Sequence, residues 1–320
     1  MRNSQVTTKA RAAIEIAPLS GALGAEVRGL DLARPLDAAT FAAVHAAYLA
    51  HQVLVFRDQR LTPDQQLAFS RRFGRLLRLP YIAPLPAHPE IIAVLKEADE
   101  RNISTFGGTW HSDFSFLERP PSASLLYALE VPARGGDTIW ADMYRAHDSL
   151  SDGLRGLLRG LRAVHSGVPY GTQGPASDLA VSRSLAITRG DPSADAEVAH
   201  PVVRRHPETG RAALFVNSVY TTRFAGMTAE ESAPLLRYLE AHATRPEFTC
   251  RVAWAPGTLV VWDNRSTQHL AVNDYDGARR LLHRTTVAGE RPLMLDEKPP
   301  PASSPPAARR RGPSGRARWN

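Results

Sequence analysis

A histidine and an aspartate stand one residue apart in the stretch GGTWHSDFSF, which covers residues 107–116. In an extended segment, residues i and i+2 point to the same side, about 6.6 Å apart along the chain. His111 and Asp113 could therefore share one ion, and an imidazole with a carboxylate suits a hard or borderline divalent metal. The pair alone does not establish a metal site, because a strand with one polar face explains it equally well.

Similar spacings elsewhere show how little the pair proves by itself. His88 and Glu90, and again His206 and Glu208, stand two residues apart with a proline between them. The second of these pairs falls in the turn HPETG, where we expect the side chains to face water. Evidence for a site must come from another part of the chain.

A second group of polar residues lies in the segment 262–289, WDNRSTQHLAVNDYDGARRLLHRTTVAG, where His269 follows a buried strand and a polar turn. In the last strand, alternation places Arg280, Leu282 and Arg284 on one face, and Leu282 indicates that this face points inward. Buried arginines are costly without anionic partners. Either they pair with acidic residues across the sheet, or they bind anionic ligands, since guanidinium binds carboxylate or sulfonate with two N–H donors.

The elements that must position these residues are mostly short strands. Apolar runs bounded by turn residues predict strands within 52–58, 91–95, 122–131, 248–264 and 279–289, and a hairpin at 200–217. Helical periodicity predicts helices within 37–51, 62–74, 149–161 and 228–242, with Thr62 and Thr228 as N-caps. Many strands with few helices favour a mainly β (α+β) fold, an antiparallel sandwich or barrel decorated with helices.

Composition and length indicate one folded domain with a basic tail. The chain has 320 residues, of which 43% are hydrophobic and 22% charged, as in ordinary globular proteins. We expect a flexible segment at 1–13, a folded domain at 14–292 and a disordered tail at 293–320. Residues 171–199 contain many breakers and little periodicity, which is typical of a mobile lid loop.

The charge distribution bears on possible partners. Residues 298–320 hold six basic and no acidic residues, which is six of the seven net positive charges of the chain. The folded part is thus nearly neutral, and binding to nucleic acid is not expected from it. The single cysteine, Cys250, excludes an internal disulfide framework, and we find neither a signal peptide nor a membrane-spanning run. These features predict a cytoplasmic protein without membrane contacts.

The two polar groups together resemble a known family. WHSDFSF followed far downstream by WDNRSTQHLAVNDYDGARRLLHR is similar to the taurine/2,4-D dioxygenase family of Fe(II)- and 2-oxoglutarate-dependent oxygenases. The likeness runs from about residue 14 to residue 292 and includes GGDTIWADM, HPVVRRHPETGRAALFVN and YTTRF in the expected order. An arginine eleven residues beyond the distant histidine completes a specific joint pattern.

The resemblance implies a set of roles. His111, Asp113 and His269 match the three residues that bind Fe(II) in the family, and they are therefore the expected catalytic residues. A further set matches residues that hold the other reactants: Arg280 and Thr138 for the distal carboxylate of 2-oxoglutarate, Arg284 for the substrate anion, and Tyr220 for a wall of the substrate pocket. The implied fold is the double-stranded β-helix, a jelly roll of the clavaminate-synthase type.

The implied reaction is oxidative decarboxylation of 2-oxoglutarate by O2, which yields succinate and CO2 while a small organic anion is hydroxylated. Members of the family commonly form dimers or tetramers, so the resemblance also implies a homo-oligomer. Asp113 argues against halogenation, because related halogenases lack this carboxylate.

The positions that contact taurine in taurine-specific members differ here. Gly107 stands where those members have asparagine, Leu79 where they have histidine, and Ile82, with Tyr81 beside it, where they have tyrosine. These changes enlarge the pocket and make it more apolar. We therefore expect taurine to be a poor substrate, and an alkyl sulfate, alkyl sulfonate or aryloxyalkanoate to fit better.

Two other function classes remain open. A cupin-like metal protein of different chemistry could use the same three ligands, but it would not need Arg280 and Thr138. An oxygenase directed at nucleic acid would depend on the basic tail.

Overall fold

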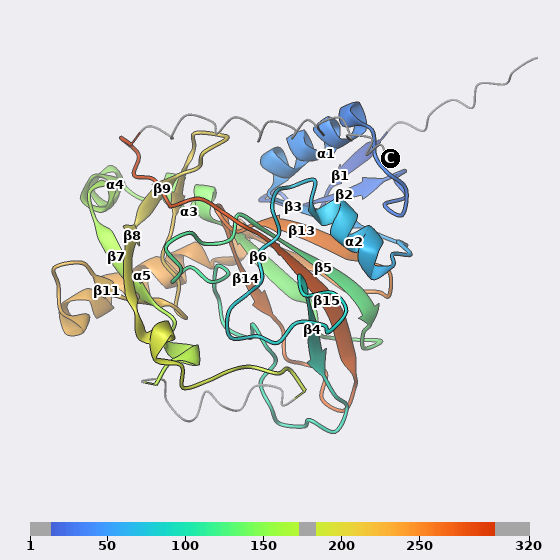
Figure 1. Cartoon of the computed structure of the whole chain (residues 1–320). Coiled ribbons are helices and arrows are strands. Elements are labelled where there is room, and N and C mark those ends of the chain that lie inside the picture. Colours follow the sequence, from blue (N-terminus) through green and yellow to red (C-terminus); the bar gives the residue numbers. More distant parts are fainter. Residues whose placement is uncertain (1–13, 173–183, 298–320) are drawn as a thin grey trace, which may run out of the picture.

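The computed structural model describes residues 14–172 and 184–297, and strands dominate it (Figure 1). The strands are β1 Glu15–Pro18, β2 Ala25–Arg28, β3 Val53–Phe56, β4 Ile91–Lys96, β5 Ala123–Glu130, β6 Thr138–Asp142, β7 Arg162–Ser166, β8 Glu197–Pro201, β9 Val203–Arg205, β10 Ala212–Leu214, β11 Thr221–Phe224, β12 Thr249–Val252, β13 Leu259–Asp263, β14 Thr267–Ala271 and β15 Arg280–Val287. The helices are α1 Ala38–His51, α2 Pro63–Ser70, α3 Met143–Asp148, α4 Asp152–Arg159 and α5 Ala229–Ala243, with short 3-10 turns η1 Val168–Tyr170, η3 Pro192–Asp195 and η4 Pro246–Phe248.

Two groups of strands face each other across the core. The larger is a seven-stranded sheet in the order β1-β2-β3-β13-β5-β15-β4. Opposite it lie the three-stranded sheets β12-β6-β14 and β11-β7-β8 and the hairpin β9-β10. Strands far apart in sequence are thus neighbours, as when β13 pairs with both β3 and β5. This is the jelly roll expected from the sequence, mainly β with peripheral helices.

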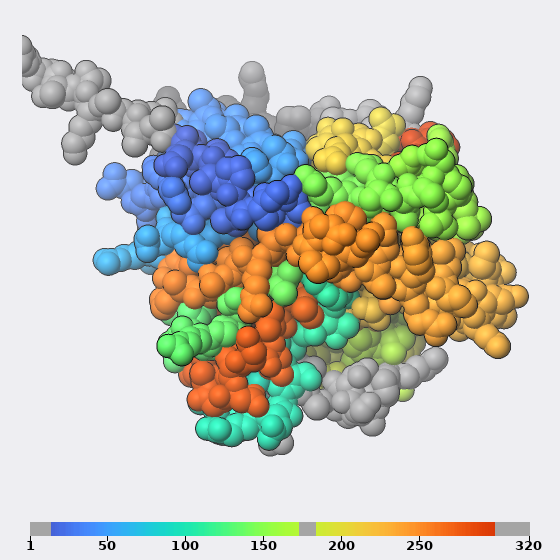
Figure 2. Space-filling view, turned by 180° about the vertical axis from the view of Figure 1, so that it is seen from behind, coloured from blue at the N-terminus to red at the C-terminus, as the bar shows by residue number. Residues whose placement is uncertain are grey.

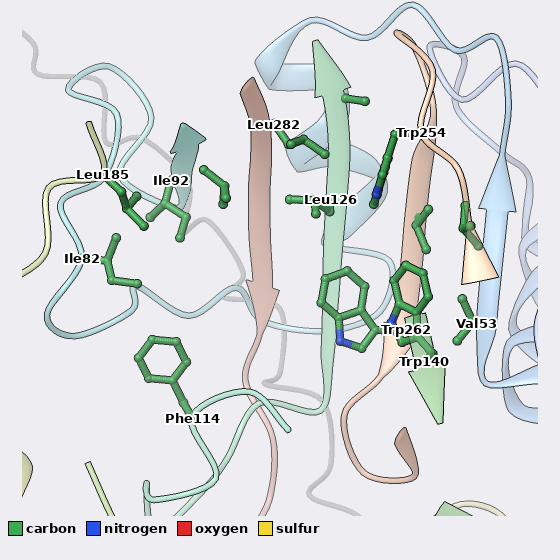
Figure 3. Close-up of a cluster of buried hydrophobic side chains, with 14 of the residues drawn as sticks. Val53, Ile82, Ile92, Phe114, Leu126, Trp140, Leu185, Trp254, Trp262 and Leu282 are labelled. Atoms are coloured by element: carbon green, nitrogen blue, oxygen red, sulfur yellow. The ribbon is translucent and has the colours of Figure 1, made fainter. Parts of the chain in front are cut away.

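The core between the sheets is apolar and aromatic. Trp140 of β6 and Trp262 of β13 pack with their ring centroids 5.7 Å apart. Figure 3 shows this pair on one side of the core, with Ile82, Ile92 and Leu185 gathered on the other. The side of the core that the tryptophans occupy lies directly beside His269, whose ring is 4.8 Å from that of Trp262.

The central strands are buried on both faces. Val53 and Val55 of β3 point into the core between the sheets, whereas Leu54 and Phe56 point outward beneath helices α1 and α2. This double burial explains why β3 is a continuous apolar run rather than an alternating one. Seen from behind, the N-terminal elements in blue cover one side of the molecule, and the orange segment that includes α5 covers the other (Figure 2).

The helix ends follow the chemistry of the sequence, with one difference. Thr62 and Thr228 cap α2 and α5, and each forms a capping box with the residue three positions later. Helix α2 ends at Ser70, before the expected stop at Gly74. Residues 72–74 instead form tighter turns, which bring the Phe73 ring within 5.3 Å of the Tyr48 ring.

The structure adds detail at two of the expected segment boundaries. Residues 184–199, expected to belong to a mobile lid loop, contain η3 and the start of β8, and Ile187 pairs with Ile82 through backbone hydrogen bonds. The remainder of that lid, 173–183, lies outside the described residues. Leu293 pairs with Arg205 and is buried, so the fold continues past residue 292. The segments 1–13 and 298–320 also lie outside the described residues. None of the helices in the described ranges has the length and apolar character needed to cross a bilayer.

Candidate active site

The structure brings the three candidate metal ligands together. One ligand atom from each of His111, Asp113 and His269 lies within 4.8 Å of the others, and all three residues are buried. His111 and His269 are joined directly, because each backbone N–H donates to the other's carbonyl, at 3.1 and 2.8 Å. Since β14 carries His269 and pairs with β6, the rigid sheet sets the position of His269 and, through this bridge, of His111.

The route by which Asp113 reaches the site differs from the expected strand. Only His111 makes a strand-like pair, and the chain turns at Asp113. Phe114 has a φ of +47°, a backbone conformation that is uncommon for a bulky residue. The turn places Asp113 Oδ1 3.5 Å from His111 Nε2 and 3.7 Å from His269 Nε2, so a turn rather than strand alternation builds the cluster.

The second oxygen of Asp113 is held by two donors. Arg284 Nη2 lies 2.6 Å from Oδ2, and Ser124 Oγ donates to Oδ2 at 2.7 Å. Burial alone raises the pKa of the Asp113 carboxyl, but Arg284, His269 and His111 outweigh this effect and hold its pKa well below the usual range. The carboxylate is therefore anionic and ready to bind a cation.

Both imidazoles are suited to metal binding in their neutral form. His111 Nδ1 lies 2.7 Å from the carbonyl of Thr109, which favours a proton on Nδ1 and leaves the Nε2 lone pair free. Burial, followed by the proximity of His111, lowers the pKa of His269 well below its usual value. Two imidazole nitrogens and one carboxylate fit a divalent transition metal such as iron.

A narrow cavity beside the cluster contains Arg280 in its lining. His111, His269, Thr138, Arg280 and Arg284 line it together with Gly107 and apolar side chains. Arg280 is only 3% exposed, yet its Nε and Nη2 have no hydrogen-bond partner among the described residues. A buried guanidinium without partners is costly, so these donors fit the carboxylate of a bound anion.

A larger cavity opens on the other side of His111. Its volume is about 420 Å³, and Tyr220 and Gly107 line it. Among the described lining residues, Arg189 is the only lysine, arginine, aspartate or glutamate side chain. Gly107 has a φ of +78°, and a Cβ there would lie 3.2 Å from His111 Cε1, so glycine leaves room for the imidazole.

The third cavity, of about 190 Å³, lies beside Arg284. Leu79 and Ile82 line it. Tyr81 lines none of these three cavities. Its ring stacks on Tyr170 at 5.2 Å, and its backbone has a φ of +65°.

Sequence reasoning missed several contacts of the site. The pairing of Arg284 with Asp113 was not foreseen, in addition to its expected role toward a substrate anion. Ser124 was not singled out, although a polar residue at every second position of the buried run SAS in 122–124 was a usable signal. His206 was expected to face water in its turn, but it is fully buried with Nε2 3.0 Å from Asp263 Oδ2.

Comparison with known proteins identifies the family. A family profile described as "Taurine catabolism dioxygenase TauD, TfdA family" matches residues 15–286. The chain is 36% identical to an alpha-ketoglutarate-dependent sulfate ester dioxygenase of Pseudomonas putida, over 92% of this chain and 97% of the relative. It is 35% identical to an alkylsulfatase of Acinetobacter baylyi, over 87% and 86%. It is 34% identical to an (S)-phenoxypropionate/alpha-ketoglutarate-dioxygenase of Sphingobium herbicidovorans, over 87% and 96%.

Solved structures agree with this assignment. A putative alpha-ketoglutarate-dependent taurine dioxygenase from Burkholderia xenovorans superposes with a TM-score of 0.75 at 36% identity, covering 89% of this chain and 96% of that one. A structure of AAD-2 in complex with Mn(II) and N-oxalylglycine superposes with a TM-score of 0.70 at 33% identity, covering 88% and 99%. The chain therefore belongs to the taurine catabolism dioxygenase TauD, TfdA family and is a 2-oxoglutarate-dependent dioxygenase.

Proposed function

We propose that this dioxygenase hydroxylates an organic sulfate ester at the carbon that bears the ester oxygen. The observation that carries the proposal is the position of Arg284, a buried cation beside both the ligand cluster and a mostly apolar cavity. Such a site suits a substrate with one anionic group and an apolar remainder. Relatives named for sulfate esters and alkyl sulfates, 36% and 35% identical over most of the chain, support the same class.

His111, Asp113 and His269 would hold the iron. Fe(II) bound there supplies the activation of O2 that couples decarboxylation of 2-oxoglutarate, to succinate and CO2, with hydroxylation of the substrate. The protein contributes a fixed ligand geometry, since two ligands are joined through the backbone and the third is held by Ser124 and Arg284.

Arg280 and Thr138 would hold the distal carboxylate of 2-oxoglutarate. Arg280 offers two buried donors that have no other partner among the described residues. Thr138 Oγ1 accepts a hydrogen bond from Trp254 Nε1 at 3.0 Å. Because the indole can only donate, the Thr138 hydroxyl keeps its own proton for the carboxylate.

Arg284 would bind the sulfate group, with Tyr220 as a wall beside His111. The rings of Tyr220 and His111 lie 6.4 Å apart at the edge of the larger cavity. Hydroxylation of the carbon next to the ester oxygen makes that carbon unstable. Its C–O bond to sulfate then breaks, the new hydroxyl loses its proton, and an aldehyde and hydrogen sulfate are released.

Leu79 and Ile82 make taurine a poor match for this site. Both are apolar and lie beside Arg284, where the ammonium group of taurine would find no acceptor from them. Gly107 likewise offers no side-chain polar group to the larger cavity. An alkyl chain would instead bury apolar surface, at about 0.8 kcal/mol for each CH2 group.

The test is succinate formation by Fe(II)-loaded protein with 2-oxoglutarate, across hexyl sulfate, hexanesulfonate, 2-phenoxypropionate and taurine. We expect hexyl sulfate to give the largest stimulation over the background without substrate, with aldehyde and sulfate formed in equal amounts to succinate. If 2-phenoxypropionate gave the largest stimulation, the reaction would stand and the substrate class would be wrong. Arg284→Lys keeps the charge but loses the two-pronged geometry, and should raise KM for the preferred anion.

A cupin-like protein of different chemistry would not respond to 2-oxoglutarate, so the background turnover of the same assay distinguishes it. Dependence on nucleic acid would require the segment 298–320, and its deletion should leave turnover of small anions unchanged. Assembly into a dimer or tetramer and a cytoplasmic location stay predictions of the sequence. Light scattering of the purified protein tests the first.

A further inference from the structure

Strand β5 carries a serine on its inner face where the following inner residues are apolar. Ser124 is fully buried and alternates with Leu126 and Ala128, which point into the core between the sheets. It stands opposite Trp262 of β13 on one side and Thr286 of β15 on the other. Three neighbouring strands therefore fix the position of its hydroxyl group.

The hydrogen bonds around Ser124 have only one consistent direction. Trp262 Nε1 donates to Asn264 Oδ1 at 2.9 Å, and an indole nitrogen cannot accept. The amide nitrogen of Asn264 must therefore face Ser124 Oγ, to which it donates at 3.0 Å. Arg284 Nη2, also a donor only, lies 3.2 Å from the same oxygen. The single proton of Ser124 is left for Asp113 Oδ2, 2.7 Å away.

The chain of hydrogen bonds from Trp262 through Asn264 and Ser124 to Asp113, called the relay below, determines how Asp113 presents its carboxylate. Oδ2 is held by Ser124 and Arg284, while Oδ1 faces the Nε2 atoms of His111 and His269. With Oδ2 engaged, the carboxylate offers one oxygen to a metal, which leaves coordination positions open for other ligands. Arg284 alone cannot secure this geometry if it also binds a substrate anion.

We propose that Ser124, fixed in place by Asn264, is the positioning residue that keeps Asp113 a one-oxygen metal ligand. Its hydroxyl group stays on Asp113 Oδ2 when the Arg284 guanidinium turns to the substrate. The inference rests on the metal site assigned above, but it requires neither 2-oxoglutarate nor any particular substrate. Outer partners of metal ligands typically contribute a factor of about 10–100 in metal affinity or activity.

The test uses Mn(II) alone as the probe of the full-length protein, with affinity measured by calorimetry and coordination by electron paramagnetic resonance. Ser124→Ala should weaken the Mn(II) Kd by about 10–100-fold and change the resonance spectrum, because Asp113 Oδ2 then keeps only its contact with Arg284 and the carboxylate is less firmly oriented. Asn264→Ala should act in the same direction with a smaller effect. It also carries the test if Ser124→Ala does not fold.

Ser232→Ala is the matched control. Ser232 is fully buried in α5, outside the relay. Its substitution by alanine removes two hydrogen bonds, to Thr228 and Phe224. It should lower the melting temperature without changing the Mn(II) Kd or spectrum. If Ser124→Ala and Asn264→Ala behave in the same way as this control, the relay is overturned and the proposed function stands. If the wild-type protein fails to bind Mn(II), both the metal site and the role of the relay are wrong.

Discussion

Arg280 allows stability and cosubstrate binding to be separated in one substitution. Its Nε and Nη2 are buried without partners among the described residues, and each such donor costs about 1–3 kcal/mol. The guanidinium lies 5.8 Å from the rings of both Trp254 and Tyr275, and each contact returns about 0.5–1 kcal/mol. Arg280→Met keeps much of the side-chain length without the charge. We expect the metal-free protein to become more stable, by up to about 5 kcal/mol.

The assay is urea unfolding of wild type and Arg280→Met, first with chelator and then with Mn(II) and excess 2-oxoglutarate. A ligand that binds only the native state stabilises it by RT ln(1 + [L]/Kd), so 2-oxoglutarate should shift the wild-type curve. It should leave the Arg280→Met curve in place. The two proteins should therefore exchange their order of stability when the ligand is added.

Arg284→Met is the matched control, because Arg284 is equally buried but paired. Its loss leaves the buried Asp113 carboxylate without its cation, and breaking such a pair typically costs about 3–5 kcal/mol. The control should thus destabilise the metal-free protein. If Arg280→Met were also destabilising, or if 2-oxoglutarate stabilised it as much as wild type, the assignment of Arg280 to the cosubstrate would be wrong.

Three further predictions concern single residues. Gly107→Ala should weaken Mn(II) binding in calorimetry, since its φ of +78° disfavours a side chain and the new Cβ would press on the His111 ring; an unchanged Kd would contradict this. Burial lowers the pKa of His200 to about 4, so its neutral form is needed in the fold, and stability is lost as the pH falls from the unfolded value near 6.5 towards 4. His200→Gln should reduce that loss of unfolding free energy, measured in urea titrations, by up to about 3 kcal/mol. If the unfolding free energies of the wild type and the variant fell equally with pH, burial of neutral His200 would not be the cause. Burial also raises the pKa of the Cys250 thiol to about 12, so iodoacetamide at pH 8 should label it only after unfolding; labelling of the native protein would show that the thiol is exposed.

Much of the fold was accessible from local patterns. The apolar run at β3, the capping residues of α2 and α5, and the hairpin β9-β10 all depend on neighbours close in sequence. Boundaries were less accurate. The end of α2, the ordered part of 184–199 and the pairing of Leu293 depend on contacts with residues far along the chain.

The sequence by itself determined which chemical groups the site contains. The family resemblance carried by the motifs around His111, Asp113 and His269 predicted a ligand set whose members the structure brings together, and the alternation in β15 placed Arg280 and Arg284 on its inward face. The second inference holds because side-chain alternation is a local property of a strand.

Only the tertiary structure decided how those groups are oriented and which of them pair with one another. The pairing of Arg284 with Asp113, the direction of the Ser124 hydroxyl and the unpaired donors of Arg280 arise where β5, β13 and β15 meet the turn at Asp113. A hydrogen bond between residues 11 to 160 positions apart depends on the register of several strands at once. That register is set by packing of the whole core, so no local pattern specifies it.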